Sequence, residues 1–145
     1  MSLEENKAIV RKVTEALSRQ DLSSLDDSVS PNYINHTYQF QNLEDLKQYY
    51  SRLYGGFPDW HETIEDIVAE GDKVWVLITY TGTHRGEYRG LAPNGKKHTV
   101  VGVVIYRIVS SRVVEAWVVE DTLDSLKQLG AIEYTEKGKK LFPDK

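Results

Sequence analysis

The feature that most constrains the fold is a series of four long segments, all after Pro58, in which apolar and polar residues alternate. A period of two is typical of half-buried strands, whereas helices repeat about every 3.6 residues. Short turn sequences such as Gly71-Asp72 and Ser110-Ser111 separate the segments. The pattern predicts an antiparallel meander with strands over Trp60–Glu70, Lys73–His84, Lys97–Val109 and Arg112–Asp121.

The part of the chain before Pro58 shows helical periodicity instead. Ser2 followed by Glu5 is the signature of a capping box, and apolar residues then recur every three or four positions. Gly55-Gly56 can end a helix because glycine readily takes the left-handed conformation. These patterns predict a helix over about Leu3–Gln20, a shorter one within Asp21–Ser30, an extended segment Tyr33–His36, and a second long helix capped by Asn42 and ending at Gly56.

Helices followed by a long antiparallel sheet indicate an α+β fold in which the helices cover one face of the sheet. The expected strands are roughly twice as long as the usual ~5–6 residues. Twist curls a sheet of such strands, so that helices laid across its concave face leave a pocket. Residues 122–130 return to helical spacing, and residues 133–145 form a charged tail that we expect to fray. We expect one domain over residues 1–145, with its core at about 4–132.

Composition argues against several classes of protein. The chain has 18 basic and 22 acidic residues, so its charge does not favour nucleic acid as a partner. It has no cysteine and therefore no thiolate metal site, its four histidines are too dispersed to indicate a metal site, and it lacks glycine-rich nucleotide motifs. The longest apolar run, Thr99–Tyr106, is less than half of the ~20 residues of a membrane span. The N-terminus is unlike a signal peptide, and we expect a cytoplasmic protein without a membrane partner.

Asp121, at the end of the last expected strand, is the best candidate for chemistry. If Ser110-Ser111 is a two-residue turn, Asp121 lies opposite Val100 and Trp117 lies opposite Val104, with Glu115 on the same face. A carboxylate on this mostly apolar face would lose solvation, which raises its pKa toward values useful to a general base. The alternative is that Asp121 caps the helix that begins after it.

Six blocks of sequence occur in the order found in a known family: Phe57–Asp59, Ile64–Val74, Thr81–Glu87, Pro93–Lys96, Val114–Trp117 and Asp121–Gly130. They resemble SnoaL-like polyketide cyclases, many of which are regarded as ester cyclases, within the NTF2-like (cystatin-like) superfamily. The resemblance covers roughly residues 4–132 and implies a cone-shaped α+β barrel, a dimer or higher oligomer, and no metal or organic cofactor. Trp75, on the opposite face from its neighbours, is a candidate for the dimer interface.

The resemblance also implies a reaction. In characterised members an aspartate at the end of the last strand acts as acid/base in an intramolecular aldol condensation that closes a ring on a polyketide ester, and Asp121 matches that aspartate. The histidine that assists it has no counterpart within Val100–Val109, so His84 is the candidate partner, with His98 as the alternative. His36 is a further candidate because isomerase relatives carry their base near that position.

The expected ligand is a hydrophobic small molecule that contains carbonyl groups. Three functions stay open: a cofactor-independent cyclase or isomerase, a noncatalytic ligand-binding module, and an enzyme similar to ketosteroid isomerase or epoxide hydrolase. Asp121 in a closed apolar pocket would favour an enzyme, and Asp121 that only caps a helix would favour the module. The aromatic candidates would look the same as plain core residues. The expected ligand-binding residues are His36, Trp117, Tyr106, Val104, Tyr49, Leu53 and Phe57.

Overall fold

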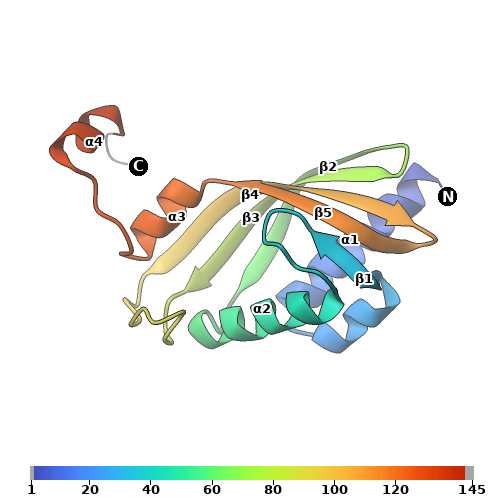
Figure 1. The fold of residues 1–145 in the computed structure, drawn as a ribbon, viewed down its shortest axis with the longest axis horizontal. Helices are drawn as coiled ribbons and strands as arrows, with labels where there is room; N and C mark the ends of the chain where they lie inside the picture. Colours follow the sequence, from blue (N-terminus) through green and yellow to red (C-terminus); the bar gives the residue numbers. More distant parts are fainter. Residues whose placement is uncertain (1, 143–145) are drawn as a thin grey trace.

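Five strands form one curled sheet in the computed structural model, which describes residues 2–142 (Figure 1). Their order across the sheet is β1-β5-β4-β3-β2. The four-strand antiparallel meander expected from the sequence is confirmed. The first strand was expected only as a brief extended segment, but it is longer and pairs in parallel with β5 at the sheet edge. The strands are β1 (Val29–Asn35), β2 (His61–Glu70), β3 (Lys73–Thr83), β4 (Lys97–Val109) and β5 (Arg112–Glu120).

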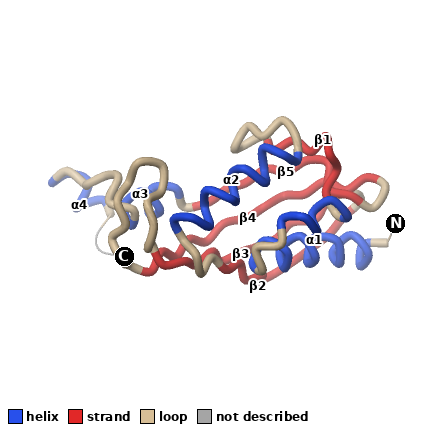
Figure 2. The backbone as a smooth tube through the Cα atoms, turned by 90° about the horizontal axis from the view of Figure 1, so that it is seen from below, coloured by secondary structure: helices blue, strands red, loops and turns tan. Residues whose placement is uncertain are grey.

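Helices cover the concave face of this sheet, as the periodicity predicted. Figure 2 shows α1 (Leu3–Ser18) and α2 (Leu43–Gly56) lying across it, and the 3₁₀ helix η1 (Leu22–Asp27) follows α1. The capping box at Ser2 is confirmed, since its hydroxyl accepts a 3.0 Å hydrogen bond from the backbone N–H of Glu5. The α+β fold with helices on the concave face is therefore the observed one.

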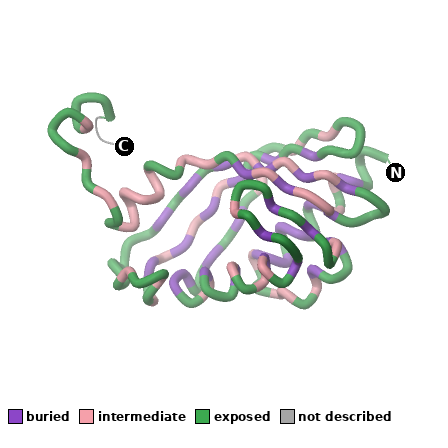
Figure 3. The backbone as a smooth tube through the Cα atoms, in the orientation of Figure 1, coloured by how far each residue is buried: buried purple, intermediate pink, exposed green. Residues whose placement is uncertain are grey.

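Two short helices follow the last strand and leave the body of the domain at one end (Figure 1). They are α3 (Thr122–Gln128) and α4 (Glu136–Leu141), and neither contains a buried residue (Figure 3). The expectation of a fraying tail missed α4, which begins where the side chain of Thr135 accepts a hydrogen bond from the N–H of Gly138. Residues 143–145 of that tail lie outside the described residues.

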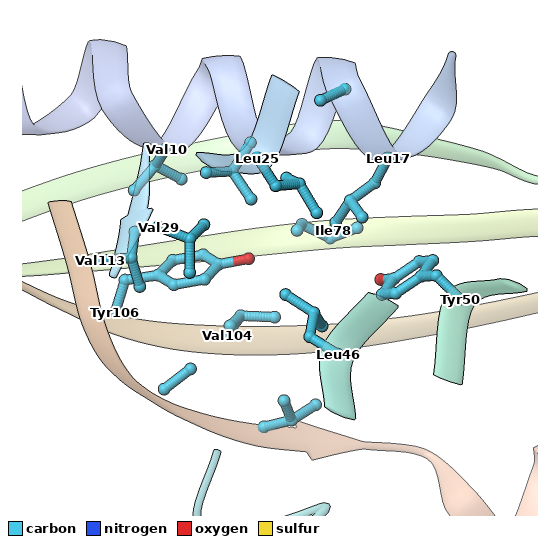
Figure 4. Close-up of a cluster of buried hydrophobic side chains, with 14 of the residues drawn as sticks. Val10, Leu17, Leu25, Val29, Leu46, Tyr50, Ile78, Val104, Tyr106 and Val113 are labelled. Carbon is cyan, nitrogen blue, oxygen red and sulfur yellow. The ribbon is translucent and has the colours of Figure 1, made fainter. Parts of the chain in front are cut away.

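The hydrophobic core lies between α1, η1 and the concave face of the sheet (Figure 4). Val10 and Leu17 on one face of α1 are almost completely buried, because helical spacing places them above the sheet. Alternate residues of β3, including Val74, Val76 and Ile78, point into this core and have no exposed surface. Between α2 and the sheet the packing is looser, and a cavity remains there.

The pairing of β4 with β5 differs from the one expected. The two-residue turn is confirmed, with Ser110 and Ser111 both at positive φ (51° and 67°) and Val109 opposite Arg112. A bulge follows at once, since Ile108 pairs with Val113 but Arg107 pairs with Glu115. One extra residue reverses which side chains face the core for the rest of the strand.

This bulge overturns the predicted face of β5. Trp117 lies opposite Ile105 rather than Val104, and the residue opposite Val104 is Val118. Trp117 and Glu115 therefore belong to the convex face of the sheet. The concave face receives Ala116 and Val118, which are buried, and Glu120, which is half-buried.

Candidate active site

A cavity of about 570 Å³ lies between the concave face of the sheet, α2 and α3. Its volume is within the range of small-molecule sites, ~300–1,000 Å³. Buried aromatic and aliphatic side chains form its inner wall, and Tyr88, Arg89 and Leu126 lie where the wall becomes exposed to solvent. Five of the residues predicted to bind ligand line it: Tyr106, Val104, Tyr49, Leu53 and Phe57.

Glu120, the last residue of β5, lines this cavity. Its Oε1 accepts a 2.7 Å hydrogen bond from the hydroxyl of Tyr38. Gly102 lies opposite it on β4, and a Cβ at that glycine would be 3.0 Å from the Cβ of Glu120, so glycine leaves room for the carboxylate. Burial, with the nearby Tyr49 and Glu120, raises the pKa of Tyr38, which therefore keeps its proton. The carboxyl group of Glu120 therefore faces the apolar cavity and keeps a fixed hydrogen-bond donor in Tyr38.

A second carboxyl group, Glu62 on β2, lies directly behind the cavity wall and is 5% exposed. Its Oε2 accepts hydrogen bonds from the Tyr50 hydroxyl at 2.7 Å and from Trp60 Nε1 at 2.9 Å. Tyr50 and Trp60 both line the cavity. Burial raises the pKa of Glu62 to about 7, although the hydrogen bonds from Trp60 and Tyr50 oppose that effect. Glu62 can therefore change its charge near neutral pH.

Two histidines were considered as partners: His84, which directly follows β3, and His98 on β4. Of these, only His98 lines the cavity. Its Nε2 lies 3.1 Å from the hydroxyl of Ser125 on α3, and burial lowers its pKa, which favours the neutral ring. His84 is 1% exposed, and its ring stacks on Phe57 with 5.0 Å between centroids. The structure places His84 behind Phe57 rather than in the cavity wall.

Asp121 is not among the cavity-lining residues. It is the N-cap of α3, where its carboxylate accepts a 3.1 Å hydrogen bond from the backbone N–H of Asp124. The capping role, the alternative considered from the sequence, is thus confirmed. A catalytic role for Asp121 stays a prediction.

His36 and Trp117, both expected to bind ligand, lie on the convex face instead. Their rings stack with 4.7 Å between centroids, and His36 Nε2 is 2.9 Å from Oε2 of Glu115. Arg107 donates a 2.9 Å hydrogen bond to the same carboxylate. Arg107 and His36 together hold the pKa of Glu115 below its usual range. The β5 bulge explains why Trp117 is on the convex face, because it turns Trp117 and Glu115 outward.

Sequence reasoning missed both carboxyl groups of the site. Glu62 carried a usable signal, because it alternates with Trp60 and Ile64 at positions that face inward on a half-buried strand. Glu120 carried none, since its inward direction follows from the bulge in β5, which no local turn residue marks. Tyr38, in the loop after β1, was likewise placed only by the fold.

A family model of SnoaL-like polyketide cyclases matches residues 7–129. The chain belongs to the SnoaL-like polyketide cyclase family. A search of curated proteins gives no significant match.

Solved structures of SnoaL-like folds agree with this assignment. AclR of Streptomyces galilaeus, a proposed hydroxylase, is 31% identical, with a TM-score of 0.82 over 94% of this chain and 87% of AclR. IdmH of Streptomyces antibioticus, a proposed polyketide cyclase, is 26% identical, with a TM-score of 0.76 over 86% of this chain and 98% of IdmH. TsrD of Streptomyces laurentii is 23% identical and shares the fold, with a TM-score of 0.83 over 91% of this chain and 99% of TsrD.

The site of this SnoaL-like family member consists of ordinary side chains around a largely apolar cavity that opens to solvent beside Arg89. Among residues 2–142, no three histidine, aspartate or glutamate side chains are grouped to hold a metal ion. No helix in the same range is long and apolar enough to cross a membrane. The groups of the lining that can exchange a proton or donate a hydrogen bond include the Glu120 carboxyl group, the neutral His98 ring, the Arg89 guanidinium and the phenols of the wall.

Proposed function

We propose that this member of the SnoaL-like family is a cofactor-independent cyclase or isomerase that acts by general acid/base catalysis on a hydrophobic molecule containing carbonyl groups. The observation that carries the proposal is the Glu120 carboxylate, which lines an apolar cavity and is oriented by the Tyr38 hydroxyl at 2.7 Å. Ring closure of a polyketide ester by an aldol reaction is the most specific form of this function.

In the proposed reaction Glu120 removes a proton from a carbon flanked by two carbonyl groups of the substrate. The resulting enolate carbon attacks a second carbonyl carbon of the same molecule, which forms the new C–C bond. The proton held by Glu120 then moves to the alkoxide oxygen produced in that step. Folding the chain so that the two carbons lie together supplies much of the acceleration, and the apolar walls of the cavity support such folding.

Phenol groups of the wall would stabilise the enolate and alkoxide oxygens. Burial raises the pKa of Tyr49 and Tyr106, so both retain their protons at neutral pH and can donate hydrogen bonds. Donors that are fixed in place before the reaction lower the energy of a developing oxyanion more than water does.

The test compares Glu120→Gln with Asp121→Asn, because the sequence-based hypothesis assigned the base to Asp121. Wild type and both variants are incubated with polyketide esters, ketosteroids and small epoxides, and products are identified by mass spectrometry. We expect Glu120→Gln to bind a substrate without converting it, and Asp121→Asn to retain turnover. The reverse result would assign the base to Asp121.

The same assay separates the other functions. Binding without conversion by wild type would indicate a noncatalytic module, and opening of an epoxide would indicate a hydrolase. Because AclR is a proposed hydroxylase, a product that has gained one oxygen atom would favour that activity over ring closure.

We also propose that the protein is a homodimer formed through the convex face of the sheet. Trp75, Ile105 and Trp117 form one cross-strand row on this face. A second row of apolar residues runs beside it, and its members Leu77 and Val119 are 39% and 67% exposed. A continuous apolar surface of this kind suits a two-fold contact with a second copy.

A further inference from the structure

The Tyr50 hydroxyl connects the cavity to the carboxyl group of Glu62, which is buried and is not among the lining residues. Tyr50, on α2, lines the cavity, and its hydroxyl is 2.7 Å from Oε2 of Glu62. Figure 4 shows the hydroxyl groups of Tyr50 and Tyr106 pointing toward each other. Trp60 Nε1 donates to the same Oε2 at 2.9 Å and fixes the carboxyl group from the other side.

We propose that Glu62 is a positioning residue whose protonation reverses the hydrogen bond with Tyr50, and so decides whether the inner wall accepts or donates a hydrogen bond toward the ligand. This inference shares one premise with the proposed function, namely that the cavity binds a small molecule with polar substituents.

The two states follow from the chemistry of the groups. An ionised carboxylate can only accept, so the Tyr50 hydrogen is directed at Glu62, and the wall offers the ligand only the phenol's lone pairs. A protonated Glu62 has a hydrogen of its own to donate to the Tyr50 oxygen. The Tyr50 hydrogen is then released toward a ligand oxygen. Trp60 cannot exchange roles, because an indole N–H is a donor only.

Groups from every neighbouring element bear on this proton. β3 contributes Tyr80, directly opposite Glu62, and β4 contributes Tyr106. α2 contributes Tyr50 and Tyr54. Burial raises the pKa values of all four tyrosines, so their phenol groups stay neutral.

Three further groups lie near Glu62. Glu120, across the cavity, adds a negative charge that raises the pKa of Glu62. Tyr38, which is hydrogen-bonded to Glu120, is also a neutral phenol. α1 contributes Ser18, which does not titrate and bonds to the backbone of Glu62. Among these groups, Glu62 is the one whose pKa burial raises to about 7.

The ligand class follows from the two states. With Glu62 protonated, the inner wall matches a carbonyl oxygen, and with Glu62 ionised it matches a hydroxyl group. A β-dicarbonyl compound presents one or the other according to whether it is in its keto or enol form. The charge of Glu62 would thus select the tautomer that is held beside Tyr50.

The first experiment follows the indole N–H signals of the ¹⁵N-labelled protein by NMR as pH is varied. The Trp60 signal should titrate with a midpoint near neutrality, because its partner is the Glu62 carboxyl group. The signal should stop titrating in Glu62→Gln. Trp75, whose side chain is on the opposite face of the sheet from Glu62, is the internal control, and Trp60→Phe assigns the signal. A Trp60 signal that does not move between pH ~5 and ~9 would overturn the proposal.

The second experiment measures binding of two probes at several pH values: 2-acetylnaphthalene, which only accepts hydrogen bonds, and 2-naphthol, which also donates. In wild type the ratio of the two dissociation constants should shift about fivefold in favour of acetylnaphthalene as Glu62 becomes protonated, as expected for one hydrogen bond. The ratio should not vary with pH in Tyr50→Phe. This variant keeps the neighbouring packing, so it serves as the test if Glu62→Gln does not fold. A constant ratio in wild type, or no binding of either probe, refutes the proposed control of the wall.

Failure of this inference is distinguishable from failure of the proposed function. Glu120→Gln should retain the Trp60 titration and the pH-dependent probe ratio even where it abolishes turnover. A wild type that shows both signals but converts no substrate would remove the enzyme proposal and leave the Glu62 switch in place.

Discussion

The side chain of Asp121 accepts a hydrogen bond from the backbone N–H of Asp124, and this contact places the carboxylate at the start of α3. The preceding residue, Glu120, has its side chain in the cavity wall and bonds to Tyr38. Adjacent residues at the end of a strand point in different directions, so two neighbouring carboxylates acquire different surroundings. One orders a helix, and the other is available to a ligand.

The capping role makes a prediction about α3. Asp121→Ala removes the cap and should weaken the helix by about 1 kcal/mol, whereas Asp121→Asn keeps a favoured N-cap residue. Because α3 has no buried residue, the loss should appear as local opening. Hydrogen exchange of the α3 amides should be about fivefold faster in Asp121→Ala than in wild type, with Asp121→Asn unchanged. Equal exchange in all three proteins would show that the cap contributes nothing.

A close approach between the end of α2 and the loop after β3 gives a second prediction. The backbone N–H groups of Arg85 and Gly86 both donate to the carbonyl oxygen of Gly56, and a Cβ at Gly86 would overlap the carbonyl oxygen of Gly55. Gly86→Ala should therefore displace the segment that carries Tyr88 and lower the free energy of unfolding by about 1–3 kcal/mol.

The matched control for Gly86→Ala is Gly55→Ala. A Cβ at Gly55 meets no atom within 4 Å, so alanine there should stabilise α2 by about 0.5–1 kcal/mol. Urea unfolding of both variants measures the two effects. Opposite signs are expected, and an unchanged stability of Gly86→Ala would contradict the close approach.

The sequence predicted the elements of this fold better than the directions of their side chains. Period-two alternation located the four long strands, and the capping sequences at Ser2 and Asn42 located the starts of α1 and α2. Caps and periodicity are local properties, and they could be interpreted without tertiary information. The parallel pairing of β1 with β5 depends on contacts between residues distant in sequence, so local patterns could not predict it.

The candidate site shows the same limit. Five of the seven predicted ligand-binding residues line the cavity, because buried aromatic and aliphatic side chains on predictable faces define its walls. A single bulge beyond the β4–β5 turn moved Trp117 to the convex face and brought Glu120 to the concave one. Register depends on every residue between the turn and the site, so one unmarked bulge changes each role after it.

The position of His36 gives a third prediction. Its ring lies on the convex face between Trp117 and Glu115, away from the cavity lining. His36→Ala should therefore leave the dissociation constant of 2-acetylnaphthalene unchanged. Tyr49→Ala, which removes part of the cavity wall, should weaken binding about tenfold or more. Equal losses in both variants would return His36 to the ligand site.

The convex face gives a fourth prediction. If its apolar rows join two copies, Leu77→Lys should convert a dimer into a monomer, because it buries a charge in the contact. Leu141→Lys is the matched control, because Leu141 is 75% exposed and lies on α4, away from the convex face. This variant should leave the dimer intact. Analytical ultracentrifugation distinguishes the two states. A wild-type monomer, or a Leu77→Lys dimer, would contradict the proposed interface.

The last prediction concerns stability and pH. The pKa of Glu62 is about 7 in the folded protein because the carboxyl group is buried, against ~4.3 in an unfolded chain. The folded state therefore binds this proton more tightly, so its contribution to stability is fully present below pH ~4 and is lost as the pH rises to about 7. The loss amounts to roughly 3 kcal/mol over that window. A glutamine at this position does not ionise, so the free energy of unfolding of Glu62→Gln, relative to wild type, should increase across the same window. Urea unfolding of both proteins at several pH values measures this difference, and curves that stay parallel would mean that Glu62 has the same pKa in both states.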